Sequence, residues 1–379
     1  MSRGVESPVR VAIFRHTLYK PSEQFIPMQA QALQGSQVLI TARDRVINPV
    51  GELDTASIFD QGKQAVIRHT LLRDRRPLKR ILEMHNIEVV HAHFGVEGMY
   101  SLPAARSLSL PHFTTLHGFD VSTSRAALLR SKRPAWMYYS MLRQKFLRSE
   151  SQFICVSRHI QQLAVELGAE PERTVVIGTG VDTERIQASE VPDTPVILHV
   201  ARLVEKKGTA YLIRAFAALV KVIPEARLRI IGSGPLEAHL KSQVAGLDLT
   251  RHVDFLGVQP HKRVLQELQK ARVLCLPSVT AASGDQEGLG QVLLEAGAMG
   301  RPVVATNHGG IADAIVHDRT GLLVGERDIL ALADALTIIL EDQSLAQRLG
   351  AAARAYVEQD FNVFLQAEKV EALYRSALV

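Results

Sequence analysis

Short apolar runs of strand length alternate with amphipathic helical segments over most of this chain. Such alternation is typical of βαβ units, which build parallel sheets covered by helices on both faces. In the first half we expect strands at residues 9–14, 38–41, 111–116, 152–156 and 174–177, and one ending in the run 88–95. In the second half we expect strands at 195–200, 227–231, 253–256, 273–276, 302–305 and 321–324. The pattern therefore predicts an α/β protein with two parallel sheets.

The two sets of strands are separated by the polar segment 189–195, which carries two prolines and is typical of a linker. At 379 residues the chain also exceeds the size at which one hydrophobic core stops growing. We therefore predict two doubly wound, Rossmann-like domains at residues 1–188 and 189–360, with a C-terminal helix at about 361–379 packing back on the first. Ligands of such sheets bind beyond the carboxyl ends of the strands, so two facing domains are expected to share one cleft.

A glycine-spaced loop followed by an apolar helical run at residues 291–299 carries two glutamates eight positions apart, Glu287 and Glu295. With a helix that starts near Gly288 or Leu289, Glu295 lies up to ~12 Å along the axis from Glu287, at ~1.5 Å per residue. The free N–H groups and the positive dipole end at Gly288, Leu289 and Gly290 suit a diphosphate. We interpret Glu287 as a partner for sugar hydroxyls and Glu295 as a partner for ribose hydroxyls. A helix cap and a solvated helix face are the alternative.

The loop that follows the expected strand 195–200 supplies positive charge. Arg202 and Lys207 lie a few residues apart in it, and Gly208 then opens a helix, which suits a diphosphate clamp. Departure of a diphosphate needs such a clamp, because negative charge grows on it in the transition state. Surface lysines in a turn are the alternative, and we prefer that interpretation for Lys206.

Three more loops of the second half carry glycine near an expected strand end, where a ligand can approach the backbone closely. They contain Gly232 with Gly234, Gly257 with Val258, and the run His308-Gly-Gly. We expect the backbone groups near Gly257 and Val258 to meet a nucleotide base. A tight turn is the alternative for Gly232 and Gly234.

In the first half, His117 and Asp120 follow an expected strand with a spacing of three. Such a pair can orient a hydroxyl or relay a proton, although Asp120 as a helix cap with His117 filling a gap is the alternative. His91 and His93 share one face of a strand, and without a third ligand in view we interpret them as a packed or hydrogen-bonded pair rather than a metal site. Gly180, after the last strand of this half, lines the cleft or forms a turn.

Composition is that of an ordinary globular protein, with 46% hydrophobic and 22% charged residues. No apolar run approaches the ~18 residues of a membrane span, and the N-terminal residues lack the apolar core of a signal peptide. These features predict a cytoplasmic protein. Cys155 and Cys275 each lie in an apolar run, so we expect both to be reduced core residues.

Positive charge is concentrated in the first half. Residues 1–190 hold 24 Lys and Arg against 18 Asp and Glu, a net of +6, which leaves 20 against 21, a net of −1, for the rest. The stretches from Arg68 to Arg80 and from Arg125 to Arg148 interleave cations with apolar or aromatic residues, and either could rest on an anionic membrane or be a solvated helix face. We expect no nucleic acid partner, since the second half is slightly acidic and no binding motif is present.

With these residues in place, the chain resembles the retaining GT-B glycosyltransferases of family four. The most specific element is the E-x7-E motif in EGLGQVLLEAGAMGRPVVAT. Around it stand VARLVEKKG, IIGSGPL, FLG, GTGVDTERI and LHGFDVS, each matching a family segment in the expected order. The resemblance covers nearly the whole chain, is strongest over residues 196–324, and implies the GT-B fold, in which two Rossmann-like domains face a cleft.

The resemblance also implies roles for single residues. Arg202 and Lys207 would bind the diphosphate of a nucleotide-sugar donor, Glu295 the ribose and Glu287 the transferred sugar, while His117 would contact that sugar from the other domain. In this family, attack and departure occur on one face of the sugar, and the leaving phosphate takes the acceptor proton. No metal and no other cofactor is required.

Two departures from the family pattern concern the first half. Arg15-His16-Thr17 replaces the glycine pair that many members carry after the first strand, and Thr179 replaces an asparagine. We therefore take Arg15 and His16, with Asp120 and Gly180, as candidates for the acceptor side of the cleft. The loops at 21–26 and 283–288 look most like bacterial exopolysaccharide transferases of the colanic acid and amylovoran type, which extend a lipid-linked (polyprenyl-diphosphate) saccharide. A basic first domain fits such an acceptor.

Two other functions stay open at this point. A GT-B nucleotide-sugar 2-epimerase would convert the donor without an acceptor, and a non-catalytic module would only bind a nucleotide or a membrane. The sequence does not choose between UDP-linked and GDP-linked donors.

Overall fold

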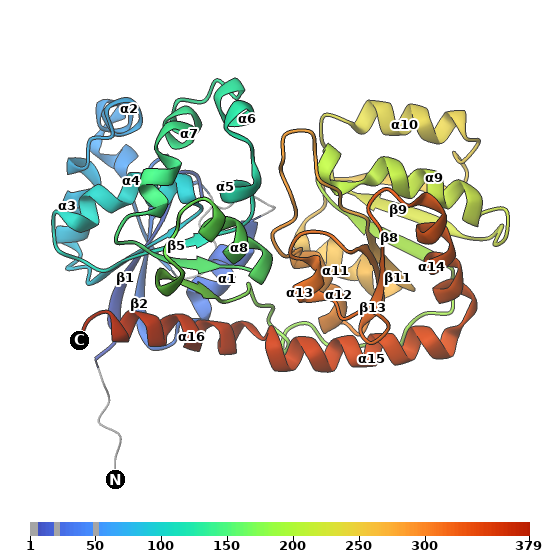
Figure 1. Ribbon diagram of the computed structural model, residues 1–379. Coiled ribbons are helices and arrows are strands. Elements are labelled where there is room, and N and C mark those ends of the chain that lie inside the picture. Colours follow the sequence, from blue (N-terminus) through green and yellow to red (C-terminus); the bar gives the residue numbers. More distant parts are fainter. Residues whose placement is uncertain (1–6, 19–22, 48–52) are drawn as a thin grey trace, which may run out of the picture. The chain divides into compact units, whose positions relative to one another are not determined.

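The computed structural model describes residues 7–18, 23–47 and 53–379. The chain divides into two compact units, of which unit 1 comprises Met1–Gly180 and Val363–Val379, and unit 2 comprises Val181–Asn362. The sequence analysis placed this boundary at residues 188 and 189. Each unit is built around one parallel sheet with helices packed against it (Figure 1).

Unit 1 contains a seven-stranded sheet of order β3-β2-β1-β4-β5-β6-β7, in which every neighbouring pair is parallel. Its strands are β1 (Val9–Arg15), β2 (Ser36–Ala42), β3 (Asp54–Ser57), β4 (Val89–His93), β5 (His112–Leu116), β6 (Gln152–Cys155) and β7 (Thr174–Val176). The sequence analysis missed β3, because this edge strand has Ala56 as its single apolar residue and so lacks the apolar run of a central strand.

The helices of unit 1 come from both ends of the chain. They are α1 (Phe25–Ala32), α2 (Lys63–Leu72), α3 (Arg76–Met84), α4 (Gly95–Arg106), α5 (Phe119–Ser122), α6 (Arg125–Arg130), α7 (Pro134–Leu147), α8 (Arg158–Glu166) and α16 (Val363–Ser376), with short 3-10 turns at Ile58–Gln61 and Pro171–Arg173. α16 lies beside α1, and its apolar face joins the core that covers β1. Polar contacts fasten it too, since Glu371 accepts from Gly35 N–H at 2.7 Å.

Unit 2 contains a six-stranded parallel sheet of order β10-β9-β8-β11-β12-β13. Its strands are β8 (Val196–Val200), β9 (Arg227–Ile231), β10 (Val253–Gly257), β11 (Val273–Leu276), β12 (Val303–Thr306) and β13 (Gly321–Val324). β11 and β12 are buried along their whole length, as the apolar runs in the sequence predicted.

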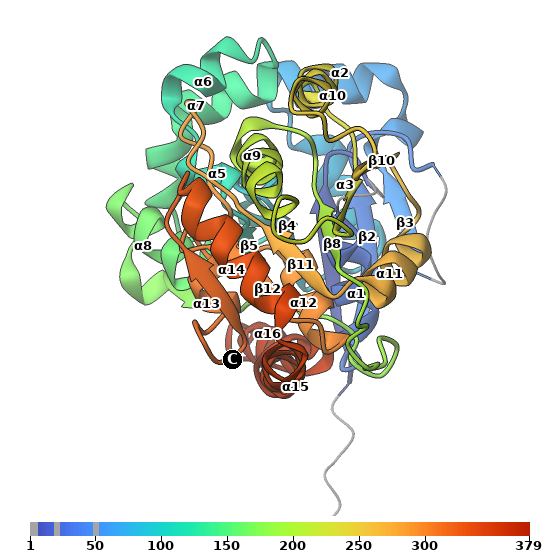
Figure 2. The ribbon, with the colours of Figure 1, turned by 90° about the vertical axis from the view of Figure 1, so that its right-hand side faces the viewer.

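Helices cover both faces of this sheet (Figure 2). They are α9 (Thr209–Leu219), α10 (Glu237–Gly246), α11 (His261–Lys270), α12 (Gln291–Ala298), α13 (Ile311–Ala314), α14 (Ile329–Glu341) and α15 (Gln343–Asp360), with a 3-10 turn at Glu205–Lys207. α9, α10 and α14 share one apolar core with the sheet. α11 contacts β8, and α12 packs against β11, β12 and α15.

The strand orders fix where a site can form in each unit. Strand order reverses between β1 and β4 in unit 1 and between β8 and β11 in unit 2. Loops that leave neighbouring strands in opposite directions open a crevice at such a point, beyond the carboxyl ends of the strands. The residues that follow β8 and β11 include Lys207 and Glu287, and those that follow β1 and β4 include His16 and Phe94.

Candidate active site

The acidic residues of the E-x7-E stretch lie where β11 leads into α12. α12 begins at Gln291, after Gly290 with φ of +89°, in agreement with the helical run expected at residues 291–299. The start near Gly288 or Leu289, which we used to place Glu295, is two to three residues too early, because these residues still belong to the loop before the first helical turn. Glu287 therefore lies in this loop and Glu295 lies inside the helix, and both are almost fully buried, at 7% and 8% exposed.

Glu287 and Lys207 form a close ion pair from loops 80 residues apart. Lys207 Nζ lies 2.5 Å from Oε2 of Glu287, and the hydroxyl of Ser278 donates to the same oxygen at 3.3 Å. Burial by itself raises the pKa of Glu287, but Lys207, Lys206 and the two hydrogen bonds outweigh burial and lower it to about 2. Glu287 is therefore ionised at neutral pH and can only accept hydrogen bonds.

Lys207 depends on this carboxylate in turn. Burial lowers the pKa of Lys207, while the charge of Glu287 acts in the opposite direction. Since a buried ammonium without a counterion tends to lose its proton, Glu287 helps to keep Lys207 positive. The pair is thus a fixed positive group for an anion next to a fixed acceptor for hydroxyls.

Lys206 is not the surface residue that we preferred. Its side chain is buried, and Nζ lies 2.9 Å from Oδ1 of Asp285 and 3.2 Å from the carbonyl of Gln286. The 3-10 turn at Glu205–Lys207 directs two successive lysines onto the loop before α12, which the sequence did not indicate. Arg202, by contrast, is exposed at the end of β8.

The glycines of the second loop have a packing role. A Cβ on Gly232 would lie 1.9 Å from the carbonyl oxygen of Ala201, and one on Gly234 would lie 2.4 Å from that of Leu203. Leu203 N–H also donates to the carbonyl of Ser233 at 2.9 Å. The absence of side chains therefore lets this loop lie directly against the loop that carries Arg202.

The remaining glycine-containing segments differ in their surroundings. Gly257 has open space where a Cβ would lie, and Val258 beside it is exposed. Gly180 lies against the backbone of Val363 in α16, where a Cβ would meet the Cα of Val363 at 2.4 Å. Gly180 is thus a contact point for the C-terminal helix within unit 1.

Glu295 has a partner that the sequence analysis missed. Nε2 of His261, at the start of α11, lies 3.0 Å from Oε1 of Glu295. The hydrogen bond and the charge of Glu295 raise the pKa of His261 against the opposing effect of burial. His261 lies at the first helical position after Pro260, and no motif in the sequence connects it with Glu295.

This pair gives unit 2 a pH-dependent contribution to stability. A histidine whose pKa is raised on folding stabilises the folded state below its ordinary pKa of about 6.5, and that contribution is lost as pH rises through the folded value. We expect His261→Gln to lower the denaturation midpoint at pH 6 and to leave it nearly unchanged at pH 9. Urea denaturation at both pH values measures this, and an equal loss at both would contradict it.

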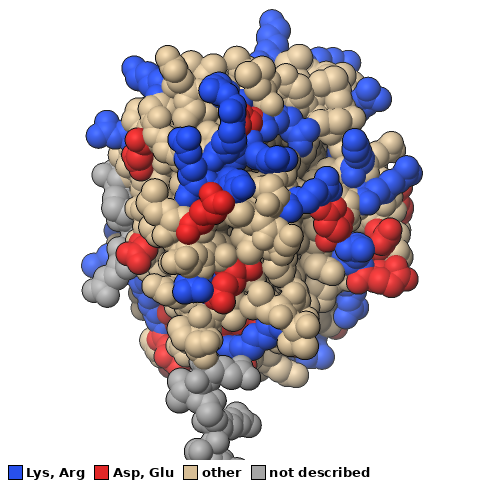
Figure 3. Space-filling view, turned by 90° about the vertical axis from the view of Figure 1, so that its left-hand side faces the viewer, with Lys and Arg blue, Asp and Glu red and all other residues tan. Residues whose placement is uncertain are grey.

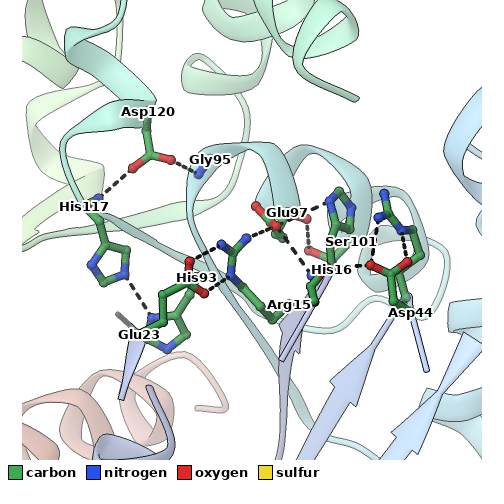
Figure 4. A network of polar contacts seen from close by, with 12 residues as sticks. Arg15, His16, Glu23, Asp44, His93, Gly95, Glu97, Ser101, His117 and Asp120 are labelled. Carbon is green, nitrogen blue, oxygen red and sulfur yellow. Dashed lines mark hydrogen bonds and ion pairs between the residues drawn. The ribbon is translucent and has the colours of Figure 1, made fainter. Parts of the chain in front are cut away.

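A separate polar network occupies the carboxyl edge of the unit 1 sheet (Figure 4). Nδ1 of His93 lies 3.0 Å from Nε2 of His117, and the ring of His93 stacks on that of His91 at 4.8 Å. Burial, with smaller contributions from Arg15 and His91, lowers the pKa of His117. His117 is therefore neutral at pH 7 and can both donate and accept a hydrogen bond.

Asp120 organises the backbone around His117. Its carboxylate accepts from the backbone N–H groups of His117 and Gly95, both at 2.6 Å. It therefore caps the N-terminus of α4, whereas the alternative in the sequence analysis was a cap on the helix that follows it. Burial raises the pKa of Asp120 to about 6, against the effect of the two backbone hydrogen bonds.

Arg15 and His16, which follow β1, belong to the same network. Arg15 pairs with Glu97 of α4 and, at 2.9 Å, with Glu23, and its guanidinium lies 4.1 Å from the ring centre of Phe94. His16 also contacts Glu97. Arg15 is thus neutralised by two carboxylates, so the network places no isolated positive charge at this position.

We also searched the described residues for metal sites and for membrane-spanning helices. Among them, no group of three or more His, Cys, Asp or Glu side chains is arranged to hold a metal ion. In the same part of the chain, no helix is both long enough and apolar enough to cross a bilayer. Cys155 and Cys275 are buried free thiols, as predicted.

Comparisons with known proteins agree across both units. A family model described as Glycosyltransferase Family 4 matches residues 59–185, and one described as Glycosyl transferases group 1 matches residues 181–356. The chain is 34% identical over 280 residues to the amylovoran biosynthesis glycosyltransferase AmsK of Erwinia amylovora. This match covers 73% of this chain and 67% of AmsK.

Two further proteins show how far the likeness extends. The chain is 29% identical to a GDP-mannose-dependent alpha-(1-6)-phosphatidylinositol monomannoside mannosyltransferase of Mycolicibacterium smegmatis. The match extends over 293 residues and covers 73% of each chain. The crystal structure of HepE from Anabaena in complex with UDP-glucose has a TM-score of 0.78 at 18% identity and covers 97% of this chain and 99% of that chain. At that identity the likeness shows a common fold.

Proposed function

This chain belongs to the glycosyltransferases of Family 4 and group 1, and we propose that it moves a hexose from a UDP- or GDP-linked donor to a saccharide acceptor with retention of configuration. The observation that carries this proposal is the buried Lys207–Glu287 pair at the crevice of unit 2. It offers a positive group for a leaving diphosphate beside an acceptor for sugar hydroxyls. Both are held in place by contacts within the protein, as preorganised catalytic groups require.

In this proposal unit 2 binds the donor. Lys207 and Arg202 hold the diphosphate near the N-terminus of α12, where Gly288, Leu289 and Gly290 present backbone to it. Glu295 accepts from the ribose and Glu287 from the transferred hexose. The base lies near the backbone of the loops that contain Gly232, Gly234, Gly257 and Val258.

The chemistry that we propose is front-face transfer. The acceptor hydroxyl attacks the anomeric carbon from the side on which the diphosphate leaves, and its proton passes to the leaving phosphate oxygen. Lys207 and Arg202 stabilise the negative charge that grows on the diphosphate, so we expect no requirement for a metal ion. Neutral His117, with its backbone fixed by Asp120, is a further proposed contact to a sugar hydroxyl.

We propose a lipid-linked saccharide as the acceptor, bound by unit 1 beyond the carboxyl ends of its strands, with Arg15, His16, Asp120 and Gly180 as the candidate residues. The similarity to AmsK, whose name assigns it to amylovoran biosynthesis, supports a role in exopolysaccharide assembly. An acceptor on a polyprenyl diphosphate stays at the membrane, so the enzyme is proposed to work there from the cytoplasmic side.

One face of unit 1 supports contact with an anionic membrane. Ile67, Leu71 and Leu72 of α2 are exposed, and α7 beside it exposes Met137 and Met141. Figure 3 shows Lys and Arg side chains gathered over part of this side of the molecule. The exposed cations in the two basic stretches are Arg68, Arg75, Arg76, Arg80, Arg125, Arg130, Lys132, Arg133, Lys145 and Arg148. Exposed apolar groups together with exposed cations in the same stretches of the chain suit insertion between anionic headgroups.

Binding to vesicles tests this surface. We expect co-sedimentation with vesicles that contain phosphatidylglycerol and little with vesicles of phosphatidylcholine alone, since each basic residue contributes about 1 kcal/mol near an anionic surface. Added salt should weaken the binding, because it screens this attraction. Leu72→Ser and Arg76→Ser should each reduce binding. Leu247→Ser and Arg251→Ser, at exposed sites of unit 2, serve as matched controls. Equal binding by all four variants would contradict this surface.

A nucleotide panel tests the donor proposal. A bound nucleotide stabilises the fold by mass action, about 2.7 kcal/mol at a hundred times its Kd, so one of UDP and GDP should raise the melting temperature clearly. Turnover of the matching sugar nucleotide with an acceptor should follow. Conversion of the donor without any acceptor would point to an epimerase, and binding without turnover to a non-catalytic module; either result would refute the proposed transfer.

A further inference from the structure

Both backbone groups of Glu287 are hydrogen-bonded to the turn after β12. Glu287 N–H donates to Nε2 of His308 at 3.2 Å, and Gly310 N–H donates to the Glu287 carbonyl at 2.9 Å. Gly309 between them has φ of +54°, and a Cβ there would lie 2.4 Å from the Glu287 carbonyl oxygen, so this approach requires glycine. The turn thus holds the backbone of Glu287 from both sides.

These contacts assign the proton on His308. Nε2 accepts from a backbone N–H, so it carries no proton, and Nδ1, 2.7 Å from Oε1 of Glu326, must donate. His308 is almost fully buried, at 4% exposed. A neutral imidazole protonated on Nδ1 is the form that satisfies both partners.

Glu326 connects His308 to the start of the same loop. Its carboxylate also accepts from the backbone N–H of Thr280 at 2.8 Å and from the Thr280 hydroxyl at 3.2 Å. Arg327 holds Glu326 at 3.2 Å and donates to the Thr280 carbonyl at 2.6 Å. The loop before α12 is therefore tied at both Thr280 and Glu287 through one histidine and one carboxylate.

We propose that His308 is a positioning residue for sugar transfer, which fixes the carboxylate of Glu287 through its backbone, with Glu326 setting the tautomer of the imidazole. This inference rests on the proposed role of Glu287 as the contact to the transferred hexose. The carboxylate of Glu287 meets Lys207 only if the backbone at Glu287 holds its place, and Nε2 of His308 accepts the hydrogen bond from that backbone N–H.

Two substitutions at His308 distinguish loss of the hydrogen-bond acceptor from loss of side-chain volume. Glutamine places an amide oxygen near the position of Nε2, whereas leucine fills similar space with no acceptor. We expect His308→Leu to lower kcat by about 10–100-fold, the effect of a small misplacement of a reacting group, and His308→Gln to recover most of that loss. Affinity for the free nucleoside diphosphate should fall much less than kcat in both, since that ligand lacks the hexose that Glu287 contacts. His239→Leu, at an exposed site on α10, is the matched control.

The outcomes distinguish this inference from the proposed function. If Glu287→Ala retains full turnover, the proposed role of Glu287 fails. If Glu287→Ala loses turnover but His308→Leu does not, the positioning role alone fails. Equal losses in His308→Leu and His308→Gln, or a parallel loss of nucleotide affinity, would also overturn it, because they indicate a general packing defect.

A spectroscopic measurement does not depend on the leucine variant folding. Long-range 1H–15N spectra of protein labelled at histidine report which ring nitrogen carries the proton, and His308→Gln identifies the signals of His308 by their absence. We expect the ring proton on Nδ1 and none on Nε2, with a change of signal in Glu326→Gln. An Nε2-protonated ring would overturn the assignment.

Discussion

Glu287→Gln is expected to lower kcat for sugar transfer by about 10²–10³-fold, in the range observed when one preorganised transition-state contact is removed. Glutamine keeps the size of the side chain but loses the charge, so hydrogen bonds from sugar hydroxyls become weaker. Steady-state turnover of the sugar nucleotide measures the loss. Glu295→Gln is the matched control, because it should weaken nucleotide binding more than kcat. A turnover within a few-fold of the unmodified enzyme would refute the proposed role of Glu287.

The same substitution should also alter the pH profile. Without the carboxylate, burial acts unopposed and the pKa of Lys207 falls further. Lys207 must be protonated to stabilise the diphosphate, so activity is lost as pH rises through its pKa. The remaining activity of Glu287→Gln should therefore decline at a lower pH than that of the unmodified enzyme, and a profile shifted toward higher pH would contradict this coupling.

The sequence was sufficient for the architecture because the strands are buried on both faces. Their apolar runs stand out against the helices between them and predicted two doubly wound domains, and the resemblance to family four implied the GT-B fold. The two parallel-sheet units and the structural neighbours confirm both expectations. β3 escaped detection because an edge strand such as Asp54–Ser57 needs no apolar run. The order of the elements thus followed from the pattern of apolar runs, except at the edge strand β3, which is not fully buried and has no such run.

The sequence predicted parts of the candidate site for a different reason. Lys207 and Glu287 each follow a central strand, and those strands, β8 and β11, are neighbours in the sheet, so the two loops meet. Glu326 also accepts from His308 across two loops, but its position after β13 carries no motif. Partners that depend on side-chain direction, such as Asp285 for Lys206, could not be predicted from spacing along the chain.

Lys207→Met should cost both activity and stability, and the two losses can be separated. Loss of the ammonium removes a positive charge next to the leaving diphosphate, so kcat should fall by about 10²–10³-fold. It also leaves Glu287 buried without its partner, and removal of one member of a buried ion pair destabilises a protein by about 3–5 kcal/mol. Turnover assays and urea denaturation measure the two effects.

The double variant Lys207→Met/Glu287→Gln decides whether the pair serves catalysis or only folding. Removing the second charge abolishes the uncompensated carboxylate, so the free energy of unfolding should recover much of the loss seen in Lys207→Met. Activity should not recover, because the diphosphate still lacks its positive partner and the hexose its acceptor. If turnover returned together with stability, the pair would be a structural ion pair, and the donor site would have to lie elsewhere in unit 2.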